Sequence, residues 1–461
     1  MVTSERIASL IDDRVAEGVF GVHRDALRDP DVFESEMRHI FEGSWVFVGL
    51  ECQAPKPNDF FTTSIGRVPV VVSRDRSGGL QCLLNSCRHR GATVFNAAQG
   101  NRRYHACPYH GWVYDSGGKC VDVKDRSSGS YAPAFDCESH DLAAVARFGN
   151  YRGFLFASLS PDVPSLEEHL NGARRFLDLV VDQGPDGLEL IPGRVSYDYA
   201  GNWKMQVENA LDLYHFTSTH PSYIDVLQDR RARRDASDAS ESASAQPGSI
   251  YEDLAAQQRS SRGSLSFRFG HVAYWGDNPN ALERPIAPAL DQIQARVGPD
   301  IAQWMLKVRN LVIYPNLQLV ENASLQLRVL RPLAVDRTEV TTWCLGPRGE
   351  GAEQRRRRIR QYEDFYNPSG LATPDDVAVY EACQRGHAAP ALGWLQGHAR
   401  GMTSSRSHAS PNAAALGVEP VESVEGPYDL GDETCLHAGY REWQRLLRKG
   451  AQASHAPGSA P

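Results

Sequence analysis

Cys87-Arg88-His89-Arg90-Gly91 and Cys107-Pro108-Tyr109-His110-Gly111-Trp112 are the two stretches that decide the fold of the chain around them. Each stretch contains one Cys–His pair, with the cysteine first. Short β-branched runs separated by Gly-rich turns surround both stretches, and this texture predicts β-hairpins. Val68–Ser73 and Leu80–Leu84 form the first predicted hairpin, and Tyr109–Tyr114 begins the second. The two Cys–His pairs are therefore predicted at hairpin tips in a small all-β unit.

Two Cys–His pairs in this order predict an iron–sulfur cluster. A Rieske centre binds one iron through two thiolates and the other iron through two imidazoles. Because each stretch offers one Cys and one His, each hairpin tip can give one ligand to each iron. A zinc finger, which is the alternative, typically pairs Cys with Cys and His with His. We therefore predict a Rieske-type [2Fe–2S] cluster bound by Cys87, His89, Cys107 and His110.

The composition limits the class of protein. The chain has 461 residues, a net charge of −8 and nine cysteines. This length is typical of two or three structural units. The negative charge gives no general attraction to nucleic acid or anionic membranes, and no apolar run approaches the roughly 18 residues that span a bilayer. We expect a cytoplasmic protein without nucleic-acid or membrane partners, whose cysteines serve metal binding rather than a disulfide scaffold.

The sequence pattern divides the chain into four regions. Residues 1–45 have apolar positions at helical spacing and are predicted to be N-terminal helices of a catalytic domain. Residues 46–165 are the predicted Rieske domain. Residues 166–450 mix strand and helix patterns, which predicts an α+β catalytic domain with the all-β domain inserted in it. The tail 451–461 is poor in large apolar groups and is expected to be flexible.

A second constellation follows the Rieske motif in the predicted helix Asn202–His215. Asp212 and His215 are three residues apart, so they are neighbours on one helical face. Pro221 disfavours the helical conformation at His220, and the resulting break lets His220 turn back toward His215. Two histidines with one distant carboxylate form the facial triad of non-haem Fe(II) enzymes that activate dioxygen. Surface or core histidines are the alternative, but a neighbouring cluster that delivers single electrons favours the iron site.

The carboxylate of this triad is predicted in Ser369-Gly370-Leu371-Ala372-Thr373-Pro374-Asp375-Asp376. An ordinary helix start explains the same residues, with Thr373 as the N-cap, Pro374 at the first helical position and acids in the first turn. The two interpretations are compatible, because a helix N-terminus is a rigid place for a metal ligand.

These motifs carry a family resemblance. The chain resembles the large (α) subunit of Rieske non-haem iron ring-hydroxylating dioxygenases, and most of all the benzoate/toluate/anthranilate branch. The resemblance covers most of residues 20–385. Besides the metal motifs, it rests on the stretches His39–Trp45, Val145–Phe148, Tyr151–Phe156, Tyr314–Asn316, Leu330–Pro332 and Arg357–Phe365.

The resemblance implies a role for each motif residue. His215, His220 and Asp376 would bind the catalytic iron. Asp212 would act in catalysis by linking His215 to a Rieske histidine of a neighbouring subunit, at the position that matches His110. The implied fold is a central antiparallel sheet flanked by helices in the catalytic domain. The implied assembly is α3, or α3β3 with a small β subunit.

The resemblance also implies the reaction, in which dioxygen and electrons from NADH, supplied by a separate flavin/ferredoxin reductase, cis-dihydroxylate an aromatic carboxylate such as benzoate or anthranilate. The implied cofactors are one Rieske cluster and one mononuclear Fe(II). Monohydroxylation of the salicylate type, oxidative demethylation and a simple Rieske electron carrier remain as alternatives. Leu213 and Phe216 are bulkier than the residues common in the branch, so the substrate can differ from benzoate and anthranilate. The candidate pocket residues are Asn209, Phe216, Asn316 and Leu371.

Overall fold

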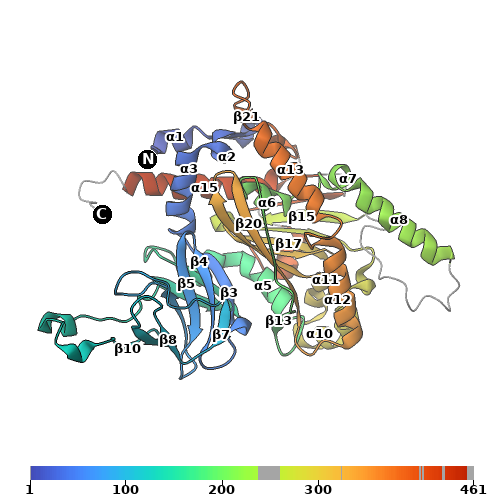
Figure 1. The fold of residues 1–461 in the computed structure, drawn as a ribbon. Coiled ribbons are helices and arrows are strands. Elements are labelled where there is room, and N and C mark those ends of the chain that lie inside the picture. Colours follow the sequence, from blue (N-terminus) through green and yellow to red (C-terminus); the bar gives the residue numbers. More distant parts are fainter. Residues whose placement is uncertain are drawn as a thin grey trace. The chain divides into compact units, whose positions relative to one another are not determined.

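The computed structural model describes residues 2–236, 260–322, 324–403, 406–407, 410–427 and 431–453 (Figure 1). The chain divides into two compact units. Unit 1 consists of Met1–Glu36 and Glu167–Pro461, and unit 2 consists of Met37–Leu166. Unit 2 is thus inserted between two segments of unit 1. Residues 454–461 of the predicted flexible tail lie outside the described ranges.

The N-terminal segment of unit 1 combines short helices with a β-hairpin. Its elements are α1 (Ser4–Ala8), β1 (Ile11–Arg14), β2 (Val19–His23), α2 (Asp25–Arg28) and α3 (Pro30–Glu36). The prediction of helices throughout residues 1–45 is wrong for β1 and β2, which pair antiparallel. Gly18, with φ of 75°, permits the turn between them, and the β-branched and aromatic residues of β2 favour a strand.

Unit 2 is built from three antiparallel sheets with the strand orders β6-β5-β4-β7, β10-β9-β8 and β11-β12-β3. Its strands are β3 (Val46–Leu50), β4 (Asp59–Ile65), β5 (Val68–Arg74), β6 (Leu80–Leu84), β7 (Gln99–Asn101), β8 (Tyr104–Ala106), β9 (Val113–Asp115), β10 (Cys120–Asp122), β11 (Arg147–Tyr151) and β12 (Phe154–Ser158). The first predicted hairpin is confirmed by the pairing of β5 with β6. The second is β9 with β10, and it begins after the Cys107–Trp112 stretch, which forms the loop between β8 and β9.

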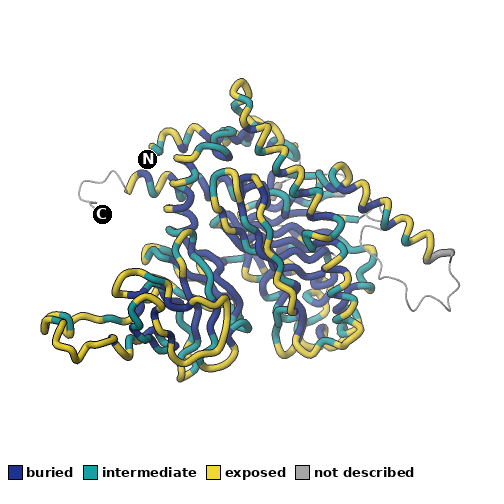
Figure 2. Tube along the Cα trace, in the orientation of Figure 1, coloured by how far each residue is buried: buried dark blue, intermediate teal, exposed yellow. Residues whose placement is uncertain are grey.

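Two apolar cores hold unit 2 together. One lies among β3, β4, β5 and β12 and includes Phe61, Val70 and Leu155. The other includes Val71 and Leu83 and continues to Cys87, Cys107 and the aromatic rings beside them. Figure 2 shows the strands of each unit as its most buried part. The two Cys–His loops are therefore mounted on a packed core rather than on free chain.

A large antiparallel sheet forms the centre of unit 1, as predicted. Its order is β13-β20-β19-β18-β17-β16-β15-β23-β22, with β14 also paired to β20. The strands are β13 (Leu188–Leu190), β14 (Val195–Tyr199), β15 (Ser261–Ser266), β16 (Val272–Gly276), β17 (Val308–Ile313), β18 (Leu317–Glu321), β19 (Gln326–Ala334), β20 (Arg337–Pro347), β22 (Arg406–Ser407) and β23 (Glu422–Pro427). Strand β21 (Trp394–Leu395) pairs instead with β2.

Helices flank this sheet (Figure 1). They are α4 (Leu166–Leu170), α5 (Arg174–Val181), α6 (Trp203–Asn209), α7 (Phe216–Thr219), α8 (Pro221–Ala236), α10 (Leu290–Val297), α11 (Pro299–Leu306), α12 (Ala352–Phe365), α13 (Thr373–Gly386), α14 (Pro411–Leu416) and α15 (His437–Ala453). Helix α6 packs on the sheet: the side-chain amides of Gln318 and Asn310 donate to the carbonyls of Gln206 and Ala210 over 2.8 and 2.7 Å. None of the helices in the described ranges is long and apolar enough to cross a membrane.

Candidate metal centres

The two Cys–His loops of unit 2 bring their four side chains together. The rings of His89 and His110 lie with centroids 4.3 Å apart, and both cysteines are buried and unpaired to other cysteines. Each loop is closed by backbone hydrogen bonds, from Cys87 to the Ala92 carbonyl over 2.9 Å and from Cys107 to the Trp112 carbonyl over 2.7 Å. The four predicted ligands therefore converge at the tips of two tight loops.

One buried atom in this group is suited to a metal. The Nδ1 atom of His110 is buried without a hydrogen-bond partner among the described residues, and such an orphaned nitrogen is costly unless it binds something. The indole of Trp112 stacks on His89 with centroids 5.0 Å apart and 11° between the planes. The Tyr114 hydroxyl lies 3.2 Å from the Cys87 sulfur. Two thiolates and two imidazoles in a packed setting fit a Rieske cluster.

The second centre lies in unit 1. His215, His220 and Asp376 each offer one possible ligand atom to a metal. These three atoms lie within 4.8 Å of one another. The Oδ1 atom of Asp376 is 3.4 Å from Nε2 of His215 and 3.2 Å from Nε2 of His220. Both Nε2 atoms and one carboxylate oxygen thus face a common point, as in a facial triad.

The backbone that presents the histidines differs in part from the prediction. Helix α6 ends at Asn209, so the predicted helix Asn202–His215 is too long, and His215 follows a turn instead. The helical break at His220 is confirmed: its φ of −115° and ψ of 41° are outside the helical region. This break between α7 and α8 lets two histidines five residues apart face the same point.

Asp376 lies in the first turn of α13, as the sequence predicts, but Thr373 is not the N-cap. The helix begins at Thr373 with Ala372 as N-cap. The Thr373 hydroxyl instead donates to the carbonyl of Tyr366 over 2.9 Å, which ties the start of α13 to the end of α12. Asp376 is thereby fixed in position from outside its own helix.

Each histidine of the triad has a carboxylate on its other nitrogen. Nδ1 of His215 is 3.0 Å from Asp212, and Nδ1 of His220 is 3.2 Å from Asp375. Asp212 also accepts from the backbone N–H of Tyr214 over 2.6 Å, which holds its carboxylate in place. Carboxylates in this position orient metal-binding imidazoles and make them better electron-pair donors to the metal.

The charges of the triad act on one another. Burial opposes ionisation of Asp376, but hydrogen bonds from His215 and His220 outweigh it and hold the pKa of this carboxyl well below its usual value. Burial likewise opposes the charge on His215, while Asp212 and Asp376 raise its pKa to about 10. The site therefore carries surplus negative potential, which favours a cation.

Two of the four candidate pocket residues, Asn209 and Phe216, lie against the triad. Asn209 lies at the triad, with its amide nitrogen 3.2 Å from His215 Nε2 and 3.0 Å from Asp376. Phe216 is buried in an apolar cluster against which Leu371 packs. Asn316 is buried and follows Tyr314, whose ring packs on Trp203 at the start of α6. Asn316 as a pocket residue therefore stays a prediction.

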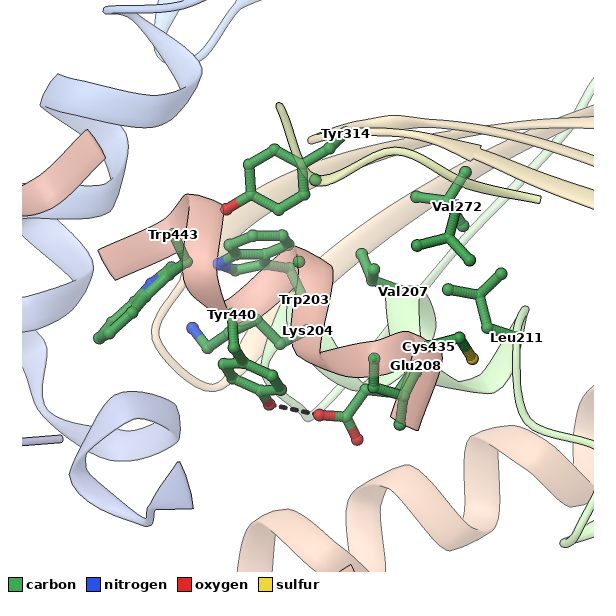
Figure 3. A pocket seen from close by; sticks show the side chains of 14 residues that line it. Trp203, Lys204, Val207, Glu208, Leu211, Val272, Tyr314, Cys435, Tyr440 and Trp443 are labelled. Atoms are coloured by element: carbon green, nitrogen blue, oxygen red, sulfur yellow. Dashed lines mark hydrogen bonds between the residues drawn. The ribbon is translucent and has the colours of Figure 1, made fainter. Parts of the chain in front are cut away.

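The structure also adds residues that the sequence did not reveal. Glu208, one turn before Asp212, accepts a hydrogen bond from Tyr440, which Figure 3 shows, and another from His398. Glu208 and Tyr440 border a small pocket between α6, the sheet and α15. No local sequence signal identifies this network, because His398 and Tyr440 are far along the chain. Asp375 lies in the predicted helix start next to Asp376, and the sequence pattern did not show that the two acids contact different nitrogens of His220.

The comparisons with protein families agree with this geometry. The model of the ring hydroxylating alpha subunit (catalytic domain) matches residues 191–449, and the model of the Rieske [2Fe-2S] domain matches residues 44–143. The chain belongs to the ring-hydroxylating alpha subunits, which are oxidoreductases with a Rieske [2Fe–2S] cluster and a mononuclear iron.

Curated relatives match almost the whole chain. It is 43% identical to the toluate 1,2-dioxygenase subunit alpha of Pseudomonas putida, with 96% of each chain covered. It is 38% identical to the 2-halobenzoate 1,2-dioxygenase large subunit of Burkholderia cepacia and 39% identical to the anthranilate 1,2-dioxygenase large subunit of Acinetobacter baylyi, covering 93% of each. The fold is similar to that of naphthalene 1,2-dioxygenase from Rhodococcus sp. bound to indole, with a TM-score of 0.76, 22% identity and 95% of both chains covered.

Proposed function

We propose that this chain is the large subunit of a terminal oxygenase that cis-dihydroxylates an aromatic carboxylate, in the class of benzoate, toluate or anthranilate. The observation that carries the proposal is the convergence of His215, His220 and Asp376 in a chain that also has a Rieske domain. The three relatives named for toluate, 2-halobenzoate and anthranilate support the carboxylate class.

The same proposal assigns the metal ligands. Cys87, His89, Cys107 and His110 would hold the Rieske cluster, and His215, His220 and Asp376 would hold the iron. The orphaned Nδ1 of His110 and the two Nε2 atoms facing Asp376 support this assignment. When bound, the cluster supplies single electrons and the iron activates dioxygen. Three protein ligands leave open coordination positions for the oxygen.

Asp212 would connect the two centres. Its carboxylate receives the Nδ1 proton of His215, which fixes the tautomer that leaves Nε2 free for metal. Only part of this carboxylate is covered, since 18% of the side chain is exposed. A Rieske histidine of a second copy, at the position of His110, can donate to the exposed oxygen and complete a hydrogen-bonded electron path. This route requires a ring of α subunits, α3 or α3β3, with a small β subunit and an NADH-dependent flavin/ferredoxin reductase.

The test is product analysis with labelled dioxygen. The enzyme, supplied with NADH and a reductase, is given benzoate, aminobenzoates, toluates and hydroxybenzoates. Two labelled oxygens in a cis-diol, or in the catechol formed by loss of the carboxylate, support dihydroxylation. One labelled oxygen means monohydroxylation of the salicylate type, and a released aldehyde means oxidative demethylation. No oxygen incorporation, with the cluster still reducible, would leave an electron carrier and refute the proposal.

A further inference from the structure

Arg328 is a buried cation without an acidic partner. Only 6% of it is exposed. The buried arginines Arg284 and Arg309 both pair with Glu321, and Arg358 pairs with Glu350. Arg328, in contrast, donates through Nε to the neutral amide of Gln326, and among the described residues no carboxylate lies within ion-pair distance. Burying a charge without a counter-charge costs desolvation free energy. An anion bound to the Arg328 guanidinium is therefore expected to stabilise the protein.

The strand register places Arg328 in a row of side chains that runs between α6 and α12. Gln318 on β18, Arg328 on β19 and Thr342 on β20 are directly opposite one another, so their side chains form one row on the same face of the sheet. At one end of the row, Gln318 donates to Gln206 of α6 over 2.8 Å. At the other end, the Thr342 hydroxyl lies 2.7 Å from the Tyr362 hydroxyl of α12. Arg328 is therefore aimed between α6 and α12.

These two helices lead directly to the triad. Helix α6 ends at Asn209, whose amide contacts both His215 and Asp376. Helix α12 ends beside Tyr366, whose carbonyl accepts from Gln326 and from Thr373, one turn before Asp376. The Arg328 guanidinium carbon lies 5.9 Å from the Tyr366 ring. Arg328 and Asp376 also act on a common group, the buried Tyr380, whose pKa burial and Asp376 raise and Arg328 lowers.

Apolar side chains lie beside this row of the sheet. Phe216, Val320, Tyr366 and Ala372 belong to one buried cluster. Val320 is directly opposite Gln326, the amide that orients Arg328. An apolar wall with one guanidinium at its edge is suited to a planar ring that carries one negative group. Neutral arenes would leave the cation uncompensated.

We propose that Arg328 binds the carboxylate of the aromatic substrate through its terminal nitrogens, with Gln326 holding Nε, and so selects anionic over neutral rings. This inference rests on the proposed function, because it assigns the recognition of the carboxylate to one side chain. A carboxylate held there keeps the ring carbon that bears it near the triad. Arg328 is a binding residue in this proposal and takes no part in oxygen activation.

The test compares Arg328→Gln and Arg328→Lys with the wild-type enzyme, and Arg331→Gln serves as the matched control. Arg331 lies on the same strand but is exposed and pairs with Glu339. The ligands are the best benzoate from the substrate panel and its uncharged amide. Equilibrium dialysis gives both dissociation constants, product formation gives kcat/KM, and the visible spectrum and iron content report whether both metal centres are intact.

Loss of charge-assisted hydrogen bonds predicts that Arg328→Gln weakens benzoate binding and lowers kcat/KM on benzoate about 100-fold. Binding of the amide should change less than about threefold, and Arg328→Lys should recover part of the benzoate affinity. Equal losses for acid and amide, a loss of iron, or unchanged benzoate binding would each overturn the proposal. If the wild-type enzyme binds no aromatic carboxylate at all, the proposed function itself fails. This outcome is separate, because it appears before any substitution is made.

Discussion

The Nδ1 atom of His220 lies 3.2 Å from a carboxylate oxygen of Asp375, on the side of the ring away from Asp376. Adjacent residues at the start of α13 thus contact opposite nitrogens of one imidazole. The Asp375 carboxylate orients His220 and makes it a stronger electron-pair donor to the metal. Replacing Asp375 with Asn removes the charge that has both effects. We expect Asp375→Asn to weaken iron binding about 10- to 100-fold, measured as the iron retained during dialysis against a chelator.

Glu363→Gln is the control for this experiment, since Glu363 is an exposed acid on α12. The Rieske spectrum of Asp375→Asn should match that of the wild type. Retention of iron equal to that of the control would show that Asp375 does not support His220.

His215→Ala should separate the two metal centres. The wild-type chain is expected to contain about three irons and two sulfides, from one [2Fe–2S] cluster and one mononuclear iron. The variant should contain about two irons, keep the visible spectrum of the cluster and form no product. Metal analysis and absorption spectroscopy check both points. Surviving turnover would contradict the assignment of His215 as a ligand.

Asp212→Asn should interrupt electron delivery even in enzyme that has been reconstituted with Fe(II) and shown by metal analysis to contain both centres. The amide keeps the shape of the side chain but removes the charge that His215 contacts and that the proposed electron path requires. We expect oxidation of the reduced cluster in the presence of substrate and dioxygen to slow at least about 100-fold, in stopped-flow absorbance. A comparable loss accompanies removal of an outer carboxylate in other metal sites.

Asp225→Asn, on the exposed side of α8, controls for the loss of one surface charge. If the Asp212→Asn cluster reoxidises as fast as the wild-type cluster, the electrons do not pass through Asp212.

Glu433 should make stability depend on pH. Burial first, and then the negative charge of Asp212, raise the pKa of Glu433 from 4.5 to about 7. His398 and Arg400 act in the opposite direction and Glu208 in the same one. The folded protein therefore keeps a proton that the unfolded chain releases. The stability from this group is fully present below about pH 4.5 and is lost as the pH rises to about 7.

Glu433→Gln removes this loss. Its melting temperature should exceed that of the wild type by a margin that grows from pH 5 to pH 8, measured by thermal unfolding at matched ionic strength. A difference in melting temperature that stays constant from pH 5 to pH 8 would refute the raised pKa of Glu433.

The buried pair Lys204–Glu36 anchors the N-terminal segment to α6 and α15. Glu36 also accepts hydrogen bonds from the indoles of Trp203 and Trp443, over 2.8 and 2.6 Å. Lys204→Met leaves a buried carboxylate without its cation, which typically costs about 3–5 kcal/mol. We expect the melting temperature to fall by about 5 °C or more, and the added change Glu36→Gln to recover part of it. A double variant no more stable than Lys204→Met would contradict this coupling.

The sequence by itself determined the two Cys–His loops and the His215–His220 segment. These motifs depend on spacing over a few residues, where turn geometry and the proline after His220 fix which side chains can meet. The β5–β6 hairpin and the first-turn position of Asp376 followed from the same short-range rules. The short helix α6 shows their limit, because its end at Asn209 is set by packing on the sheet and not by the apolar repeat.

Only the tertiary structure decided which distant residues complete each site. It separated Asp376, which faces both histidines, from Asp375, which lies behind one of them. It also aligned Arg328 with Gln318 and Thr342, which contact α6 and α12, through the register of β18, β19 and β20. Contacts between residues a hundred positions apart depend on strand order and register, which no local spacing encodes. The candidate metal ligands could thus be predicted from local sequence motifs. The proposed binding of the substrate carboxylate by Arg328, in contrast, depends on strand register and could be inferred only from the fold.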